Sequence, residues 1–137
     1  MTTTLESNAS LLRTALKGNS AFSLLSAAAL IAAASPLADF LGLGWPLALT
    51  VVGFVLAAHA MVLWWGSSQL MIPRWLVWYA IEGDIGWIIA TIVVLVVDPW
   101  SFTTGGKWLL AAMGDVVAVF AILQYIGLRR VDHPPTK

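Results

Sequence analysis

The chain has no cysteine among its 137 residues. This absence excludes disulfides, thiolate metal sites and thiol catalysis, and it leaves the redox compartment of the protein undetermined. Charge is also scarce, because charged residues make up 10% of the chain and the formal net charge is zero. Such a sequence offers no basic face for a nucleic acid and no acidic tail for a basic partner, so we expect no nucleic-acid partner.

Apolar residues dominate what is present: they make up 60% of the chain, and the mean hydropathy is +0.88. A helix needs about 20 residues to cross a hydrocarbon core of about 30 Å. Four stretches meet this requirement and leave no room for a separate soluble domain. Their apolar runs cover every face, whereas transmembrane strands would alternate apolar and polar residues. We therefore predict one all-α domain over residues 1–137, a four-helix transmembrane bundle with spans at residues 10–35, 45–65, 74–97 and 107–128.

Prolines mark the ends of the predicted helices. Pro36 ends the first helix and Pro99 the third, because the residue before a proline is pushed out of the helical conformation. Pro46 suits the first turn of the second helix. Residues 1–10 are polar and are interpreted as a short disordered lead to a retained membrane helix, in preference to a cleaved signal.

The two halves of the chain resemble each other. Aligning Pro36 with Pro99 places Asn19 on Glu82, and the glycine and alanine positions of the second span then fall close to those of the fourth. This pattern predicts two parallel-repeat helical hairpins, an arrangement found in some transporters. Apolar helices also align by chance, so duplication and coincidence both stay open.

The basic residues favour one orientation. An even number of spans puts both termini on one side, and the positive-inside rule makes the more basic side cytoplasmic. We therefore expect a multi-pass protein of the cell inner (plasma) membrane with both termini in the cytoplasm. Lys107 is alone on the outer side, and the cations on the inner side are Arg13, Lys17, Arg74, Arg129, Arg130 and Lys137.

Several polar residues lie inside the predicted spans. A charged side chain at the bilayer centre costs roughly 2.5 to 3.5 kcal/mol, so such residues are candidates for function. Counting 1.5 Å per residue from the span centres places them within roughly 6 Å of the midplane. The candidate intramembrane polar site consists of Asn19, His59, Glu82, Asp84 and Asp115.

The two aspartates are the hardest to explain as packing. No side-chain stem is long enough to carry their carboxylates to water, so each must be protonated, paired or beside a wet cavity. Glu82 and Asp84 lie about 200° apart around one helix, and they cannot both face one cavity. We expect Asp84 to point inward with Trp87 and Thr91 on its face, and Glu82 to face another helix.

Simpler roles are open for the other polar residues. Lys17 can snorkel to the headgroups or act as an ion-pair partner of Glu82. Asn19 is expected to form an interhelical hydrogen bond worth roughly 0.6 to 2 kcal/mol. His59 is interpreted as a neutral hydrogen-bonding residue in preference to a haem or metal ligand, because it lacks a second ligand of known position. Gln124 is interpreted as an interfacial polar residue near the cytoplasmic end.

Three segments carry a resemblance. They are LRTALKGNSAFS at residues 12–23, GDIGW at residues 83–87 and LQYIGLRR at residues 123–130. In this combination the chain resembles a widespread group of small bacterial four-span membrane proteins of uncharacterised function, over nearly its whole length. The resemblance implies a four-helix bundle in the inner membrane. It implies no activity, cofactor or catalytic residue.

The sequence contains no nucleophile elbow, phosphate loop, paired metal-ligand motif or dinucleotide fingerprint. We therefore expect a protein that is not an enzyme and that has no metal site and no cofactor. The polar layer favours proton-linked transport or sensing of a small solute or ion. The alternative is a non-catalytic structural or assembly subunit, working as a homo-oligomer or with a membrane-complex partner in the lipid bilayer. A membrane enzyme or haem carrier is the third reading.

Overall fold

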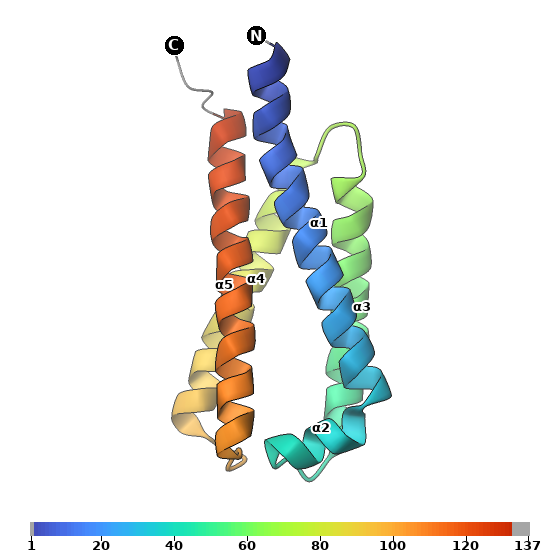
Figure 1. Cartoon of the computed structure of the whole chain (residues 1–137), viewed down its shortest axis with the longest axis vertical. Coiled ribbons are helices and arrows are strands. Elements are labelled where there is room, and N and C mark those ends of the chain that lie inside the picture. The colour runs from blue at the N-terminus through green and yellow to red at the C-terminus, as the bar shows by residue number, and fades with distance from the viewer. Residues whose placement is uncertain (1, 133–137) are drawn as a thin grey trace.

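The structure is a computed structural model, which describes residues 2–132, and side chains from residue 9 onward. Within this part of the chain every regular element is a helix, so the predicted all-α class is confirmed (Figure 1). Four of the helices, α1, α3, α4 and α5, are long and apolar enough to cross a membrane. The elements in chain order are α1 (Thr2–Ala32), α2 (Ala34–Leu41), α3 (Pro46–Ser67), α4 (Arg74–Val97) and α5 (Thr104–Asp132).

Helix α1 differs from the prediction at both ends. It begins at Thr2, so the disordered lead is wrong for residues 2–10, while Met1 lies outside the described residues. At its other end α1 stops at Ala32, three residues before the predicted end. Pro36 explains this break, because it lacks the N–H that would bond to the carbonyl of Ala32, and its ring would clash with that carbonyl.

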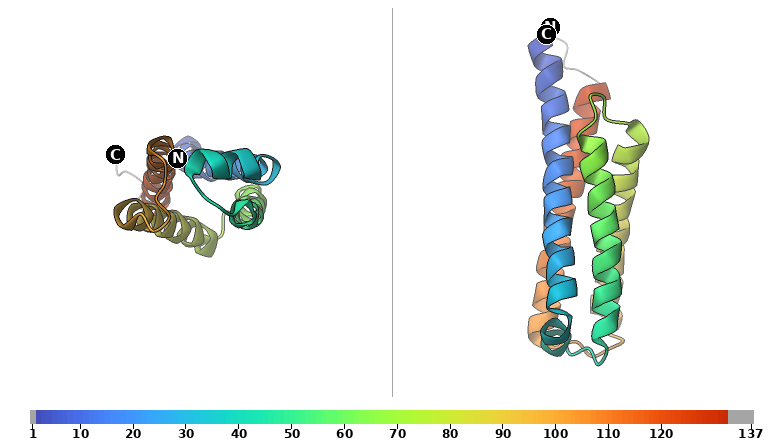
Figure 2. Two further views of the ribbon diagram at one scale, coloured as in Figure 1. Left: turned by 90° about the horizontal axis from the view of Figure 1, so that it is seen from below. Right: turned by 90° about the vertical axis from the view of Figure 1, so that its right-hand side faces the viewer.

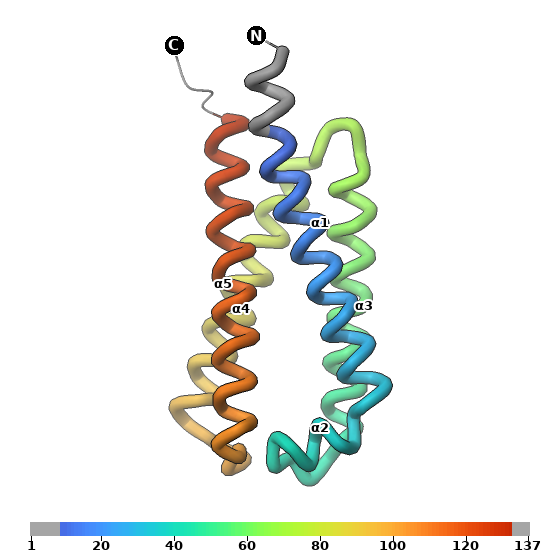
Figure 3. The backbone as a smooth tube through the Cα atoms, viewed as in Figure 1, coloured from blue at the N-terminus to red at the C-terminus, as the bar shows by residue number. Residues whose placement is uncertain are grey.

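Helix α2 is absent from the sequence-based prediction, which has only a loop after Pro36. In the structure Pro36 lies in the first turn of α2, where the missing N–H has no helical partner to lose. The helix ends at Leu41 and is followed by Gly42, which caps it in the left-handed conformation with a φ of 84°. Figure 3 shows α2 lying across the end of the bundle that is opposite to the start of α1 and the end of α5. There it contributes to a small apolar cluster of Ala38, Leu41, Leu49 and Phe102.

The four long helices do not pack equally. Helix α1 packs most closely against α3, and α5 packs against both α1 and α4, whereas the consecutive helices α3 and α4 barely touch (Figure 2). The two hairpins are therefore α1–α3 and α4–α5, joined mainly along α1 and α5. If the two hairpins were a parallel duplication, the contact between α3 and α4 would be as extensive as the contact between α1 and α5. The α3–α4 contact is much smaller. The duplication stays a prediction.

Close helix contact is concentrated toward the end where α1 begins and α5 ends. A larger apolar cluster fills this region, and Gly127 of α5 permits the approach of α1. A Cβ atom on Gly127 would lie only 2.9 Å from the Cα atom of Leu12, so no other residue fits there without moving a backbone. The cluster consists of Leu12, Leu16, Leu63, Leu76, Val77, Ala80, Ile81 and Leu128.

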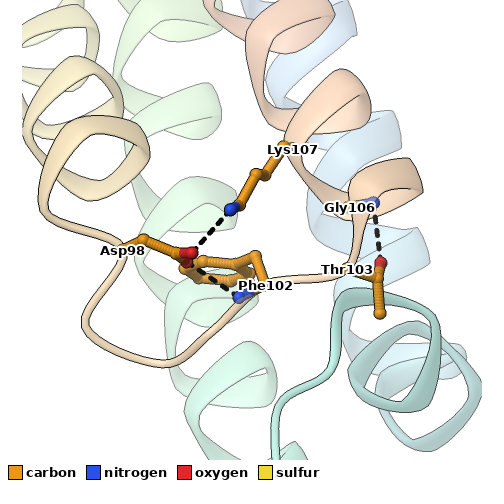
Figure 4. A network of polar contacts seen from close by, with 5 residues as sticks. All are labelled: Asp98, Phe102, Thr103, Gly106 and Lys107. Carbon is orange, nitrogen blue, oxygen red and sulfur yellow. Dashed lines mark hydrogen bonds and ion pairs between the residues drawn. The ribbon is translucent and has the colours of Figure 1, made fainter.

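The loop between α4 and α5 is held by a polar network (Figure 4). The carboxylate of Asp98 accepts a hydrogen bond from the backbone N–H of Phe102 at 2.8 Å and pairs with the ammonium of Lys107 at 2.5 Å. The side-chain oxygen of Thr103 accepts the N–H of Gly106 at 2.9 Å in the first turn of α5. The hydrogen bond from Lys107, followed by that from Phe102, lowers the pKa of the Asp98 carboxyl below its ordinary value.

The first residues of α1 and the last of α5 lie at the same end of the bundle (Figure 1). At this end of the bundle, Arg74 at the start of α4 forms an ion pair of 2.9 Å with Asp132 at the end of α5. Most of the cations from which the orientation is predicted lie at this end of the bundle. Lys137 lies outside the described residues. Lys107 at the opposite end is neutralised by Asp98, which strengthens the charge difference between the two ends.

Candidate functional site

Asp84 lies in the middle of α4 with only 4% of its surface exposed. Its Oδ2 atom accepts two hydrogen bonds, one from the Asn19 side-chain amide of α1 at 2.8 Å and one from the Gln124 side-chain amide of α5 at 3.2 Å. The prediction that Asp84 points inward is confirmed. One carboxylate thus joins three of the four long helices, and we call Asp84, Asn19 and Gln124 the Asp84 centre.

Asn19 is also buried, at 1% exposure, and it extends the polar contacts along α1. Its side-chain oxygen accepts a hydrogen bond of 3.3 Å from Ser23, one turn further on. The neighbouring Ser20 donates to the backbone carbonyl of Ala60 in α3 at 2.7 Å. The prediction that Asn19 forms an interhelical hydrogen bond is confirmed, and Ser20 connects α3 to the same layer.

The helical repeat explains why the three side chains of the Asp84 centre lie on the buried faces of their helices. Each member of the Asp84 centre occupies a position where the buried stripe of its helix continues, three or four residues from a buried apolar neighbour. Thr91, two turns beyond Asp84, also faces α5, because its Cγ2 atom lies 3.4 Å from the position of a Cβ on Gly114. The buried residues of α5 are Gly106, Gly114, Val117, Ala121, Gln124, Gly127 and Leu128.

Gln124 is the residue that sequence reasoning missed. Its interpretation as an interfacial residue is wrong, because the side chain is fully buried and bonded to Asp84. Its position in the stripe of small residues that includes Gly114 and Ala121 was the available signal. Its Oε1 atom is buried and has no hydrogen-bond partner among the described residues. An unsatisfied buried acceptor costs roughly 1 to 3 kcal/mol, which is uncommon in a well-packed interior.

His59 forms a separate contact with Tyr79 of α4. Its Nδ1 atom and the hydroxyl of Tyr79 in α4 are hydrogen-bonded at 3.1 Å, and the two ring centroids are 5.3 Å apart. This pair bridges α3 and α4 where their packing is sparse, in keeping with a hydrogen-bonding role. Within the described residues, no three His, Cys, Asp or Glu side chains gather in a way that could hold a metal ion.

Glu82 and Asp115 are not part of the Asp84 centre. Both side chains are exposed on the outer faces of their helices, and neither has a hydrogen bond or ion pair among residues 9–132. Of the two roles open to Lys17, the ion pair with Glu82 is not formed. Its ammonium lies 5.6 Å from the centre of the Trp64 ring, in a cation–π contact between α1 and α3.

The Asp84 centre can accommodate a carboxyl group in either protonation state. An ionised Asp84 accepts N–H bonds from both amides, as the structure has it. A neutral Asp84 carries an O–H donor, and rotation of the Gln124 amide by half a turn would present Oε1 as its acceptor. With that rotation, Asp84 and Gln124 would keep one hydrogen bond between them in both states.

Comparison with protein-family models, with curated proteins and with solved structures finds no match to this chain. The resemblance to small bacterial four-span membrane proteins stays a prediction. The functional proposal therefore rests on the geometry of the Asp84 centre.

Proposed function

We propose that this protein senses or moves protons, in linkage with a small solute or ion, through the Asp84 centre. It does so as a multi-pass protein of a bacterial inner membrane with both termini in the cytoplasm. The observation that supports this most is a carboxylate buried in mid-span and bonded to amides of two other helices. Ionisable groups at such depth are costly, and proteins that keep them commonly use them in proton relays or ion pathways.

The contacts of Asp84 supply a way to couple protonation to helix position. Hydrogen bonds to an ionised carboxylate are roughly twice as strong as those between neutral groups. Protonation of Asp84 therefore weakens its bonds to Asn19 on α1 and Gln124 on α5 together. Because α3 and α4 barely touch while α5 packs against α1, a movement coupled to protonation would have to take place along the α1–α5 contact, where both Asn19 and Gln124 lie.

Proton flux into vesicles tests this proposal. The purified protein is reconstituted with a pH-sensitive dye inside the vesicles, and the internal pH is followed after an external acid step. We expect a flux, or its stimulation by an added solute, that Asp84→Asn abolishes while folding is kept. Asp39→Asn is the matched control, because Asp39 is an exposed carboxylate of α2 outside the four spans. If vesicles with Asp84→Asn, vesicles with Asp39→Asn and vesicles without protein all show the same flux, proton transport is ruled out.

A second candidate function is a structural or assembly subunit, which the outer faces of α4 and α5 favour. Glu82 and Asp115 are exposed on these faces within predicted membrane spans, where a carboxylate in contact with lipid is costly. A second copy of the chain, or a helix of a partner protein, would cover them. Native mass spectrometry of Glu82→Leu and Asp115→Leu tests this: loss of an oligomer supports assembly, and an unchanged monomer argues against it.

A further inference from the structure

A basic pocket lies at the end of the bundle where α1 begins. It has a volume of about 420 Å³ and lies between residues 9–17 of α1 and the loop that joins α3 to α4. Its polar side chains recur every three or four residues along α1, so they share one face of that helix. The lining residues are Ala9, Ser10, Arg13, Thr14, Lys17 and Leu70.

Both cations of the pocket are held in place by contacts with α3 and its loop. The guanidinium of Arg13 donates to the backbone carbonyls of Ser67 and Leu70, the latter at 3.2 Å. Guanidinium has five N–H donors, so Arg13 keeps donors for a further acceptor. Lys17 is positioned over the ring of Trp64. Among the side chains that the structure describes, from residue 9 onward, no carboxylate pairs with either cation, and this part of the chain gives the pocket two positive charges.

The depth of the pocket matches the lipid headgroups. Arg13 precedes Asn19 of the Asp84 centre by six residues, which is about 9 Å along the helix, and Ser10 lies about 13 Å away. Half of a hydrocarbon core measures about 15 Å, so a centre near mid-span places the pocket just below the headgroup level. Leu70 beside it is 99% exposed and Met71 is 88% exposed. Apolar side chains in this position are suited to contact acyl chains.

We propose that this pocket binds the phosphate group of an anionic phospholipid. Arg13 and Lys17 supply two positive charges to the phosphate, and the hydroxyls of Ser10 and Thr14 supply hydrogen bonds to its remaining oxygens. Leu70 would pack against the first carbons of the acyl chains. The site is separate from the Asp84 centre, and it stands whether or not that centre handles protons.

Native mass spectrometry of the full chain in detergent tests the proposal, with phosphatidylglycerol and phosphatidylcholine as probes. We expect one phosphatidylglycerol molecule to be retained in preference to phosphatidylcholine. Lys17→Gln should weaken this binding about fivefold, the effect of one basic group at a membrane surface. Lys17→Arg should restore it. Arg129→Gln is the matched control, because Arg129 is an exposed cation at the same end that does not line the pocket, and it should bind as the parent protein does.

Inorganic phosphate distinguishes the two sources of a phosphate group. If millimolar phosphate does not displace phosphatidylglycerol, the ligand is the lipid; if it does, the site is still a phosphate site but takes a soluble anion. The proposal is overturned if phosphatidylcholine binds equally well. It is also overturned if Lys17→Gln and Arg129→Gln weaken binding to the same extent, because the cations then act only as a general surface charge.

Discussion

Gln124 donates its side-chain amide to Asp84 at 3.2 Å while its own buried oxygen remains without a partner. This arrangement is asymmetric, because the other donor to Asp84, Asn19, has its oxygen satisfied by Ser23. The two amides should therefore contribute differently to stability. Both ends of the Asn19 amide are bonded, whereas the unbonded oxygen of Gln124 is the acceptor that a protonated Asp84 would need.

We predict that Asn19→Leu destabilises the protein more than Gln124→Met. The first change removes the shorter bond to Asp84 and leaves the carboxylate and Ser23 each short of a partner, at a cost of about 2 to 3 kcal/mol. The second removes a longer bond and also the unsatisfied oxygen, so the two effects largely cancel. Thermal unfolding in detergent, followed by circular dichroism, measures both. A larger loss for Gln124→Met would contradict the assigned contacts.

Gly127 should tolerate no side chain, because α1 and α5 meet there. We predict that Gly127→Ala destabilises the bundle by roughly 1 to 3 kcal/mol, since the new Cβ would press on the backbone of Leu12. Gly86→Ala is the control in α4, because a Cβ at Gly86 meets nothing within 4 Å. Alanine there should be neutral or stabilising by about 0.5 to 1 kcal/mol. Unfolding of the two variants side by side gives the comparison, and equal effects would show that the α1–α5 contact is wrong.

The α4–α5 loop should weaken in acid. The bonds to Asp98 lower the pKa of its carboxyl, so this group contributes stability above its unfolded-state pKa and loses it as pH falls through the folded-state pKa. We predict that the parent protein is more stable than Asp98→Asn at neutral pH and that the difference shrinks toward about pH 3. Asparagine tolerates the left-handed conformation of Asp98, which has a φ of 47°, so the variant changes charge without straining the backbone.

Thermal unfolding of the parent protein and Asp98→Asn across this pH range is the measurement. Asp39→Asn serves as the control, because Asp39 is an exposed carboxylate at the same end of the bundle without this loop network. A difference that grows as the pH falls would have the wrong sign and would refute the assignment of the Lys107 pair.

The sequence predicts the four long helices and the inward direction of Asp84 because both follow from local rules. A long apolar run must form a helix in lipid, and the helical period separates Asp84 from Glu82. It does not predict helix α2, because a proline that ends one helix can equally lie in the first turn of the next.

The partner of Asp84 on α5 depends on how the helices dock, which no local pattern specifies. Asp115 and Gln124 lie on the same helix, and only the docking of α1 and α4 against α5 decides that Gln124 is inside and Asp115 outside. An ion pair between Lys17 and Glu82 is one of two roles that the sequence leaves open to Lys17, yet Lys17 contacts Trp64 of α3 instead. Depth can be counted from a sequence, whereas rotation about the helix axis relative to a neighbour cannot.

The central claim is that Asp84 binds and releases a proton inside the bundle, and infrared spectroscopy of the carboxyl stretch tests it most directly. Difference spectra are recorded through a pH titration of the reconstituted parent protein, Asp84→Asn and Asp115→Asn. The account predicts a reversible protonated-carboxyl band that is missing from Asp84→Asn and retained in Asp115→Asn. A titration in which Asp84→Asn keeps every carboxyl band of the parent protein would contradict it.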